Sequence, residues 1–416
     1  MAYLARTVDA ELDDLLAIAP AIALDGAKGV GKTATARRRA DHSWLLDDPA
    51  QRALLEADPS FRAAPPGTLL LDEWQRLPEV WDSVRRRVDD GVTPGRFLLT
   101  GSATPAKGID THSGAGRILS LRMRPMALHE RGIVAPTVSI GRLLRGEHAT
   151  VSGRTDLTVV AYFDAIESSG FPGIHRQPRR LTRGLLEVYL QRVIDRDLPD
   201  VGFAVRRPET LRRWLTAYAA SSSTSASYTR ILDATTVGDG SQPAKTTTIA
   251  YRDHLTQLWL LDPVPGWSPA RNPLARLQQA PKHQLADPAL AARLLNLSAR
   301  TLASGPGAPM AGPLFESLAT LTVRVAAQAA EARVGHLRTR NGDHEVDLVV
   351  EGPEGQVLGV EVKLAANATD ADGRHLRWLR EQLGGDVVDL MIITTGTTAY
   401  RRPDGIAVVP LGLLGA

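Results

Sequence analysis

The sequence contains no cysteine among its 416 residues. Disulfides, thiol nucleophiles and zinc or iron–sulfur sites with cysteine ligands are therefore excluded. The 10 histidines include no H-x-x-x-H pair of the kind that binds zinc on a helix. Any metal ion is therefore expected to have oxygen ligands.

Long hydrophobic runs are also absent, since no stretch approaches the roughly 18 to 20 apolar residues of a membrane span. The segment Met1 to Asp14 carries acids where a signal peptide has a basic and then an apolar run. We therefore expect a cytoplasmic protein with no membrane association. Hydrophobic residues make up 43% and charged residues 23%, which is a globular composition. At roughly 150 residues per domain, the length predicts about three domains.

Lysine is scarce, and most of the 49 basic residues are arginine. A GC-rich genome is the simpler explanation of this bias, although Lys32 and Lys363 both fall within motifs described below. The 46 acidic residues leave a net charge of +3, which permits nucleic-acid binding without implying it. Short basic clusters such as Arg37 to Arg39 and Arg85 to Arg87 could contact phosphate, but solvated helix faces have the same composition.

The chain divides into three predicted regions, 1–135, 136–304 and 305–416. The first alternates short apolar runs with helix-compatible segments, which predicts a parallel α/β sheet with strands at Ala21 to Leu24, Thr68 to Leu71 and Phe97 to Thr100. The second is mostly helical, and its stretch Ser221 to Trp267 would fit a winged helix. A segment rich in Gly, Ala and Pro, Gly305 to Pro313, opens the third.

A phosphate-binding loop is predicted directly after the first apolar run. The pattern G-x-x-x-x-G-K-[ST] is matched by Gly26, Gly31, Lys32 and Thr33, with a further glycine at Gly29. Glycines let backbone N–H groups surround phosphate oxygens, the lysine reaches the β- and γ-phosphates of ATP, and the threonine hydroxyl binds Mg²⁺. ATP and Mg²⁺ are the expected cofactors.

The next two predicted strands end in polar residues suited to hydrolysis. Asp72 follows an apolar run and could hold magnesium, while Glu73 could polarise the attacking water. Thr100, or failing it Ser102, could hydrogen-bond that water or the γ-phosphate. The alternatives are solvated acids at a strand end and an ordinary Gly-Ser turn.

These motifs resemble those of bacterial and archaeal AAA+ ATPases that join an N-terminal ATPase to a C-terminal domain of unknown function with a restriction-nuclease-like core. Further similar blocks are Tyr3 to Arg6, Leu46 to Pro49, Leu71 to Pro78, Phe97 to Ser102, Gly114 to Arg117 and Leu121 to Glu130. The resemblance implies that Arg117 is an arginine finger that reaches the γ-phosphate of a neighbouring subunit, and hence a homo-oligomer. Pairing with a local carboxylate is the alternative for Arg117. The middle region resembles the family more loosely.

A possible metal site lies in the third region, where the sequence predicts a helix, three strands, a further helix and a strand. Asp347 and Glu361 could share magnesium if their strands pair, and Lys363 could position or deprotonate a water. The pattern resembles the D…E-x-K core of restriction-endonuclease-like nucleases, and the resemblance adds Glu316 as a further acid. Cross-strand charge pairing would look the same.

Two functional hypotheses remain open from the sequence. The leading one is an ATPase whose nucleotide cycle controls a nuclease-like C-terminal domain associated with nucleic acid. The alternative is a nucleotide-dependent binding switch with a catalytically inert C-terminal module.

Overall fold

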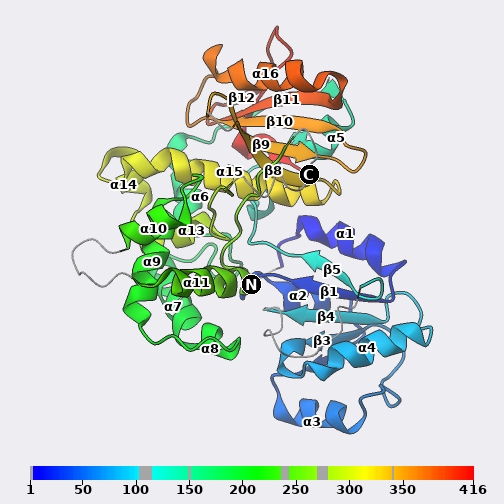
Figure 1. Cartoon of the computed structure of the whole chain (residues 1–416). Coiled ribbons are helices and arrows are strands. Elements are labelled where there is room, and N and C mark those ends of the chain that lie inside the picture. Colours follow the sequence, from blue (N-terminus) through cyan, green and yellow to red (C-terminus); the bar gives the residue numbers. More distant parts are fainter. Residues whose placement is uncertain (1–2, 103–114, 149–150, 236–242, 269–279, 340–341) are drawn as a thin grey trace.

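The computed structural model describes residues 3–102, 115–148, 151–235, 243–268, 280–339 and 342–416. Two large sheets and a group of helices form three bodies, with the long helix α15 lying between the upper sheet and the other two bodies (Figure 1). The mixed α/β class, the N-terminal parallel sheet, the helical middle and the C-terminal sheet domain are as predicted.

The N-terminal sheet has five parallel strands in the order β2-β3-β4-β1-β5. Their bounds are β1 Ala21–Asp25, β2 His42–Leu45, β3 Leu69–Asp72, β4 Phe97–Gly101 and β5 Leu119–Arg122. The three strands predicted from apolar runs are confirmed. The other two, β2 and β5, are half-exposed and partly polar, so they carried no such signal.

Helices cover both faces of this sheet, namely α1 Thr7–Leu16, α2 Lys32–Arg37, α3 Pro49–Ala57 and α4 Glu79–Asp89. Side chains alternate across a strand, so Ile22 and Leu24 pack on the side of α1 and α2. Ala21 and Ala23 pack in the separate core that includes residues of α3 and α4. Because both faces of the central strands are buried, their sequences are continuous apolar runs rather than alternating apolar and polar residues.

The middle of the chain is helical, as predicted. Its helices are α6 Val159–Ser168, α7 Arg179–Arg192, α8 Leu198–Asp200, α9 Pro208–Ala220, α10 Tyr228–Ala234, α11 Lys245–Gln257, α13 Pro288–Leu294 and α14 Ala299–Ser304. A π-helical turn, η4 Val193–Asp197, continues α7 into α8. Antiparallel bridges that join Leu261 to Leu285 and Val264 to Lys282 follow α9 to α11. Three helices before a small antiparallel pair are compatible with a winged helix, and that assignment stays a prediction.

The C-terminal sheet has seven strands in the order β7-β12-β13-β11-β10-β9-β8. Their bounds are β7 Gly153–Arg154, β8 Arg333–Arg338, β9 Glu345–Glu351, β10 Val357–Val362, β11 Val387–Thr394, β12 Thr398–Arg401 and β13 Ala407–Pro410. The helices α15 Ala311–Gln328 and α16 Arg374–Leu383 also lie where the sequence predicted helices. The short strands β12 and β13 were not predicted.

Strand pairing crosses the predicted boundary between regions 136–304 and 305–416. β7 joins the C-terminal sheet through β12, and β6 Val138–Ser139 pairs with β14 Leu414–Gly415. The intervening helix α5 Ile140–Leu144 packs against β10 and β11. The three-region division by sequence position stays a prediction, and β6, α5 and β7 lie against the C-terminal body. Within the described ranges, no helix is long and apolar enough to cross a membrane.

Candidate functional site

The predicted phosphate-binding loop joins the end of β1 to the start of α2. Gly31 directly precedes α2 with φ +105°, a left-handed conformation that glycine adopts without strain. A Cβ atom on Gly26 would lie 2.1 Å from the carbonyl oxygen of Met123. The loop therefore requires glycine at both positions, for backbone conformation at one and for space at the other.

Lys32 is the first residue of α2, and its ammonium group is folded back into the loop. Its Nζ donates to the carbonyl oxygens of Gly26 at 2.8 Å and Ala27 at 2.9 Å. Burial lowers the pKa of Lys32 to about 8, although the nearby Glu73 and other carboxylates oppose that shift. The ammonium group is thus held by neutral acceptors that phosphate oxygens can replace.

Thr33, Asp72 and Thr100 meet at the carboxyl ends of the strands. The hydroxyl of Thr33 donates to Asp72 Oδ1 at 2.7 Å, and the hydroxyl of Thr100 donates to the same oxygen. Asp72 on β3 and Thr100 on β4 are direct partners in the parallel register. A hydroxyl and a carboxylate beside a phosphate loop form the oxygen donor set that Mg²⁺ prefers, so these residues fit the predicted ion.

Glu73 follows β3 with a positive φ of +55°, which is uncommon for a residue with a side chain. Its Oε2 accepts hydrogen bonds from Gln75 Nε2 and, at 3.3 Å, from the Ser102 hydroxyl. Gln75 also donates to Ser102 at 3.2 Å, which closes a small polar network. Gln75 was not predicted from the sequence. The network holds the Glu73 carboxylate next to Asp72 at the end of the sheet.

Arg117 lies just before β5, which is an edge strand of the sheet next to β1. Its Nε donates to Asp89 Oδ1 of α4 at 2.7 Å, and its side chain is 45% exposed. This is the local carboxylate pairing that the sequence left open as the alternative. A role as an arginine finger stays a prediction.

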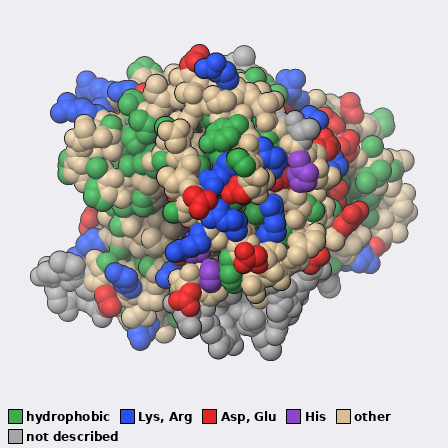
Figure 2. All heavy atoms as spheres, turned by 90° about the horizontal axis from the view of Figure 1, so that it is seen from above, with side chains coloured by type: hydrophobic (Ala, Val, Ile, Leu, Met, Phe, Trp, Pro, Cys, Tyr) green, Lys and Arg blue, Asp and Glu red, His purple; other side chains and the backbone are tan. Residues whose placement is uncertain are grey.

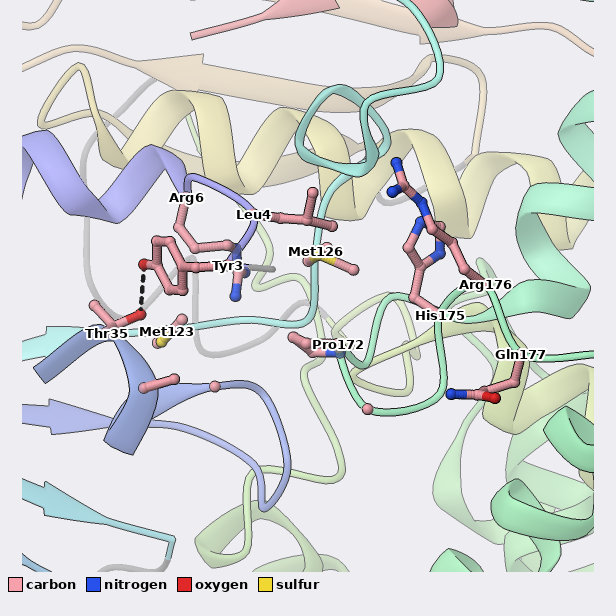
Figure 3. Close-up of a pocket in the computed structure, with 13 residues that line it drawn as sticks. Tyr3, Leu4, Arg6, Thr35, Met123, Met126, Pro172, His175, Arg176 and Gln177 are labelled. Atoms are coloured by element: carbon pink, nitrogen blue, oxygen red, sulfur yellow. Dashed lines mark hydrogen bonds between the residues drawn. The ribbon is translucent and has the colours of Figure 1, made fainter. Parts of the chain in front are cut away.

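A cavity of about 560 Å³ lies beside α2, with Gly31, Ala34 and Thr35 in its wall. Figure 3 shows Tyr3, Met123 and Pro172 converging on it from three segments of the chain. The Tyr3 hydroxyl hydrogen-bonds to Thr35 Oγ1 at 2.9 Å. The lining is largely apolar and adjoins the phosphate loop, as expected for a nucleotide base pocket. Sequence reasoning missed this pocket because its walls come from distant segments.

The helical middle contacts the phosphate loop on another side. Lys28 Nζ pairs with Asp197 Oδ1 at 3.1 Å, and Arg76 pairs with Asp200 Oδ2 at 3.2 Å. A small cavity of about 80 Å³ between the two bodies is lined by Lys28, Glu73, Asp197 and other residues. The π-helical turn η4 ends at Asp197, so an irregular helical segment reaches the candidate site.

The C-terminal acids come together as predicted, on neighbouring antiparallel strands. Asp347 on β9 accepts the backbone N–H of Val362 of β10 through Oδ2 at 2.9 Å. Glu361 on β10 is 2% exposed, and its Oε2 accepts from Lys363 Nζ at 2.9 Å. Burial and the nearby Asp347 hold the pKa of Glu361 well above its usual range. Glu316 of α15 completes the predicted group.

Lys282 from the middle region also lies in this acid cluster, which the sequence did not predict. Its Nζ lies 2.8 Å from Asp347 Oδ1, 2.9 Å from Glu316 Oε1 and 3.4 Å from Glu345 Oε1. Burial and the charge on Asp347 raise the pKa of Glu316 to about 7. No group of three or more His, Asp or Glu side chains suited to holding a metal is found in the part of the chain that the structure describes.

Lys282 carried one weak signal in the sequence, since lysine is scarce and this position retains it. As arranged, the acid cluster does not fit a magnesium ion, because an ammonium group lies among the expected ligands. A metal at Asp347 and Glu361 therefore stays a prediction that this geometry does not support.

Residues 19–131 match the family model of the AAA domain, residues 160–301 match a domain of unknown function (DUF8612), and residues 311–414 match another (DUF4143). Uncharacterized proteins of Mycobacterium tuberculosis (Rv2008c) and Mycobacterium bovis (Mb2031c) are each 27% identical over 418 residues, covering 97% of this chain and 83% of theirs.

Two solved structures are similar at lower levels. The Walker-type ATPase PABY2304 of Pyrococcus abyssi aligns with 69% of this chain and 94% of its own, at 15% identity and a TM-score of 0.36. The ORC2 protein of Aeropyrum pernix, in complexes with ADPNP and ADP, aligns with 69% of this chain and 89% of its own, at 16% identity and a TM-score of 0.29.

The parallel sheet, its phosphate loop and the family match define a P-loop ATPase domain of the AAA class. In this chain that domain is followed by a DUF8612 region and a C-terminal DUF4143 domain.

Proposed function

We propose that the protein binds ATP with magnesium at the phosphate loop and hydrolyses it, and that the nucleotide cycle acts on the C-terminal domain. The observation that carries this proposal is the convergence of Lys32, Thr33, Asp72 and Thr100 at the carboxyl ends of β1, β3 and β4. Ligands of open α/β sheets bind at this edge.

Each residue has a defined task in this mechanism. Thr33 and Asp72 would hold the magnesium ion, which supplies charge neutralisation on the β- and γ-phosphates when bound. The Lys32 ammonium group exchanges its carbonyl acceptors for phosphate oxygens. Glu73 accepts a proton from water as the water oxygen attacks the γ-phosphorus. The bond from that phosphorus to the bridging oxygen then breaks, and ADP and phosphate leave.

Paired substitutions test the assignment. Lys32→Ala should abolish ATP binding and turnover, because the phosphates lose their buried cation. Glu73→Gln should keep ATP bound but lower turnover by at least about 100-fold, since an amide cannot take the proton. Glu56→Gln on the exposed face of α3 is the matched control and should leave both unchanged. Retained turnover in Glu73→Gln would remove Glu73 as the base.

For the C-terminal domain we propose association with nucleic acid, and the sequence leaves open whether this nuclease-like domain also cleaves it. Seen from the side of α16, basic and acidic side chains are intermingled rather than separated (Figure 2). Arg377 of α16 and Arg402 both pair with Asp370 and Asp404. ATP turnover should be measured with single- and double-stranded DNA and RNA, and cleavage scored in the same reactions. Unchanged turnover and no binding would reject nucleic acid as a partner.

The second candidate is a nucleotide-dependent switch with a C-terminal domain that does not cut. The position of Lys282 within the acid cluster favours it, because the predicted metal ligands already have a cation partner. Cleavage in magnesium that Asp347→Ala abolishes would reject this candidate. Arg117 remains the proposed arginine finger of a homo-oligomer. Mixing Lys32→Ala with Arg117→Ala chains should restore turnover if that residue acts on a neighbour.

A further inference from the structure

The backbone that carries Lys282 is fixed to both the middle region and the C-terminal sheet. Lys282 and Val264 exchange backbone hydrogen bonds of 2.9 and 3.0 Å. Two residues beyond Val264, Gly266 bridges to His336 of β8, and Trp267 N–H donates to the carbonyl oxygen of His336 at 2.6 Å. The lysine is therefore presented to β8 and β9 by a short extended segment rather than by a free surface loop.

The ammonium group of Lys282 is enclosed by acids from two elements. Its side chain is 1% exposed, while those of Glu316 and Asp347 are 16% and 14% exposed. An ammonium group has three donors, and three carboxylates lie within 3.4 Å of this one. A buried lysine with this set of partners is fully neutralised within the chain.

A divalent ion would need the same oxygens. Magnesium binds carboxylate oxygen at about 2.0 to 2.1 Å and calcium at about 2.3 to 2.6 Å, so either ion would lie in direct contact with the oxygens that Lys282 now holds. The second oxygen of Asp347 already accepts the Val362 N–H, and Oε2 of Glu361 already pairs with Lys363, whereas Oε1 of Glu361 has no hydrogen-bond partner among the described residues. The Lys282 ammonium group already occupies the position between the Asp347 and Glu316 oxygens, so a metal ion could bind both of these oxygens only if the lysine side chain moved away.

We infer that the Lys282 ammonium group fills the cation position of this cluster, so that the C-terminal domain binds no divalent metal ion there. The ion pairs of Lys282 instead join the C-terminal domain to the middle region. This inference does not depend on the proposed ATP hydrolysis. Lys282 then holds the two parts of the chain in place, and the acids can bind a metal ion only when the lysine is removed.

Binding of Mn²⁺ to the full-length chain without nucleotide tests the inference, with free Mn²⁺ followed by electron paramagnetic resonance. The wild type and Asp347→Asn should bind the same number of Mn²⁺ ions per chain, because the wild type has no Mn²⁺ site at Asp347. Lys282→Ala should gain one Mn²⁺ per chain, and the double variant Lys282→Ala/Asp347→Asn should lose it again. Asp72→Asn in the Lys282→Ala background should leave the gained site intact, which separates it from the phosphate loop. The exposed Lys245→Ala is the matched control and should gain nothing.

Removal of Lys282 leaves buried acids unpaired, so the variant can lose stability. Its thermal midpoint should then rise in Mn²⁺ by more than that of the wild type, and Lys282→Arg, which keeps the charge, should show neither gain nor rescue. A wild-type Mn²⁺ site that depends on Asp347 would overturn the inference even if Lys282→Ala does not fold. A folded Lys282→Ala chain with no additional site would overturn it equally.

Discussion

Lys32 and Lys282 are both almost completely buried, yet their partners give them opposite properties. Lys32 faces two neutral carbonyl oxygens, and burial lowers its pKa to about 8. Lys282 faces three carboxylates, and their charges hold its pKa above its usual range despite burial. A lysine with neutral acceptors can exchange them for phosphate, whereas one that is neutralised by carboxylates has no free capacity for an anion. Lysine is therefore suited to binding phosphate at the phosphate loop and to stabilising the contact between the middle region and the C-terminal sheet in the acid cluster.

Ala34 offers a test of the base pocket at the residue scale. It lies on α2 in the wall of the 560 Å³ cavity and is exposed to it. Ala34→Phe should fill part of the pocket without disturbing the buried side of the helix. ATP affinity should fall at least about tenfold, a loss of about 1.4 kcal/mol, while affinity for inorganic tripolyphosphate should not change.

Calorimetric titration of the two ligands measures this difference. Gly184→Ala on α7 is a suitable control, since a Cβ atom there meets nothing within 4 Å. An equal loss of affinity for both ligands would place the fault in the phosphate loop rather than in a base pocket.

At the scale of elements, β8 joins the C-terminal sheet to the middle region. His336 of β8 is 1% exposed, and its Nε2 lies 3.0 Å from the carbonyl oxygen of Ala280. A neutral imidazole can donate this hydrogen bond. Burial, and then the charge on Lys282, lower the pKa of His336 to about 4. The folded chain therefore favours the neutral form of the His336 imidazole at this junction.

The sign of the pH dependence follows from that shift. Between about pH 6.5 and pH 4 the unfolded chain carries the proton on His336 and the folded chain does not, so stability falls as the pH falls. His336→Gln, whose amide can donate the same hydrogen bond, should reduce this loss by up to about 3 kcal/mol. Urea unfolding at pH 7 and pH 4.5 measures it, with exposed His42→Gln as the control. Identical acid sensitivity in wild type and His336→Gln would contradict the prediction.

At the scale of the whole molecule, one carboxylate lies where the three bodies meet. Asp262 of the middle region pairs with Arg124 at 2.8 Å, with Arg324 of α15 at 3.1 Å and with Arg122 of β5 at 3.6 Å. These arginines hold the pKa of Asp262 far below its usual range. Because Arg122 ends the strand beside β1, this cluster links the sheet that carries the phosphate loop to the C-terminal domain.

Asp262→Asn should therefore loosen all three bodies together. The three partly buried arginines would lose their shared, buried carboxylate, and breaking a buried ion pair on one side costs about 3 to 5 kcal/mol. Chemical unfolding should show that loss, and limited proteolysis should show cleavage between the bodies. Asp253→Asn, which removes an exposed pair with Arg252, should change stability by less than about 0.5 kcal/mol. If Asp262→Asn lowered the free energy of unfolding by as little as Asp253→Asn does, the ion pairs of Asp262 would not hold the three bodies together.

The sequence by itself determined the elements whose information is local. The phosphate loop is contiguous, and its glycines, lysine and threonine follow one apolar strand, so spacing alone identified Gly26 to Thr33. Alternation along neighbouring strands was likewise enough to bring Asp347 and Glu361 together. Short or half-exposed strands such as β2 and β12 could not be predicted, because partner strands rather than their own composition stabilise them.

Only the tertiary structure decided which distant residues meet. Lys282 precedes Asp347 by 65 positions, and Arg124 precedes Asp262 by 138, so no local pattern links either pair. The 560 Å³ cavity beside α2 likewise joins Tyr3 to Pro172 across the chain. Burial makes these contacts strong, and burial is a property of the packed chain. For that reason the nucleotide site could be predicted from the sequence, whereas the cation that fills the C-terminal acid cluster could not.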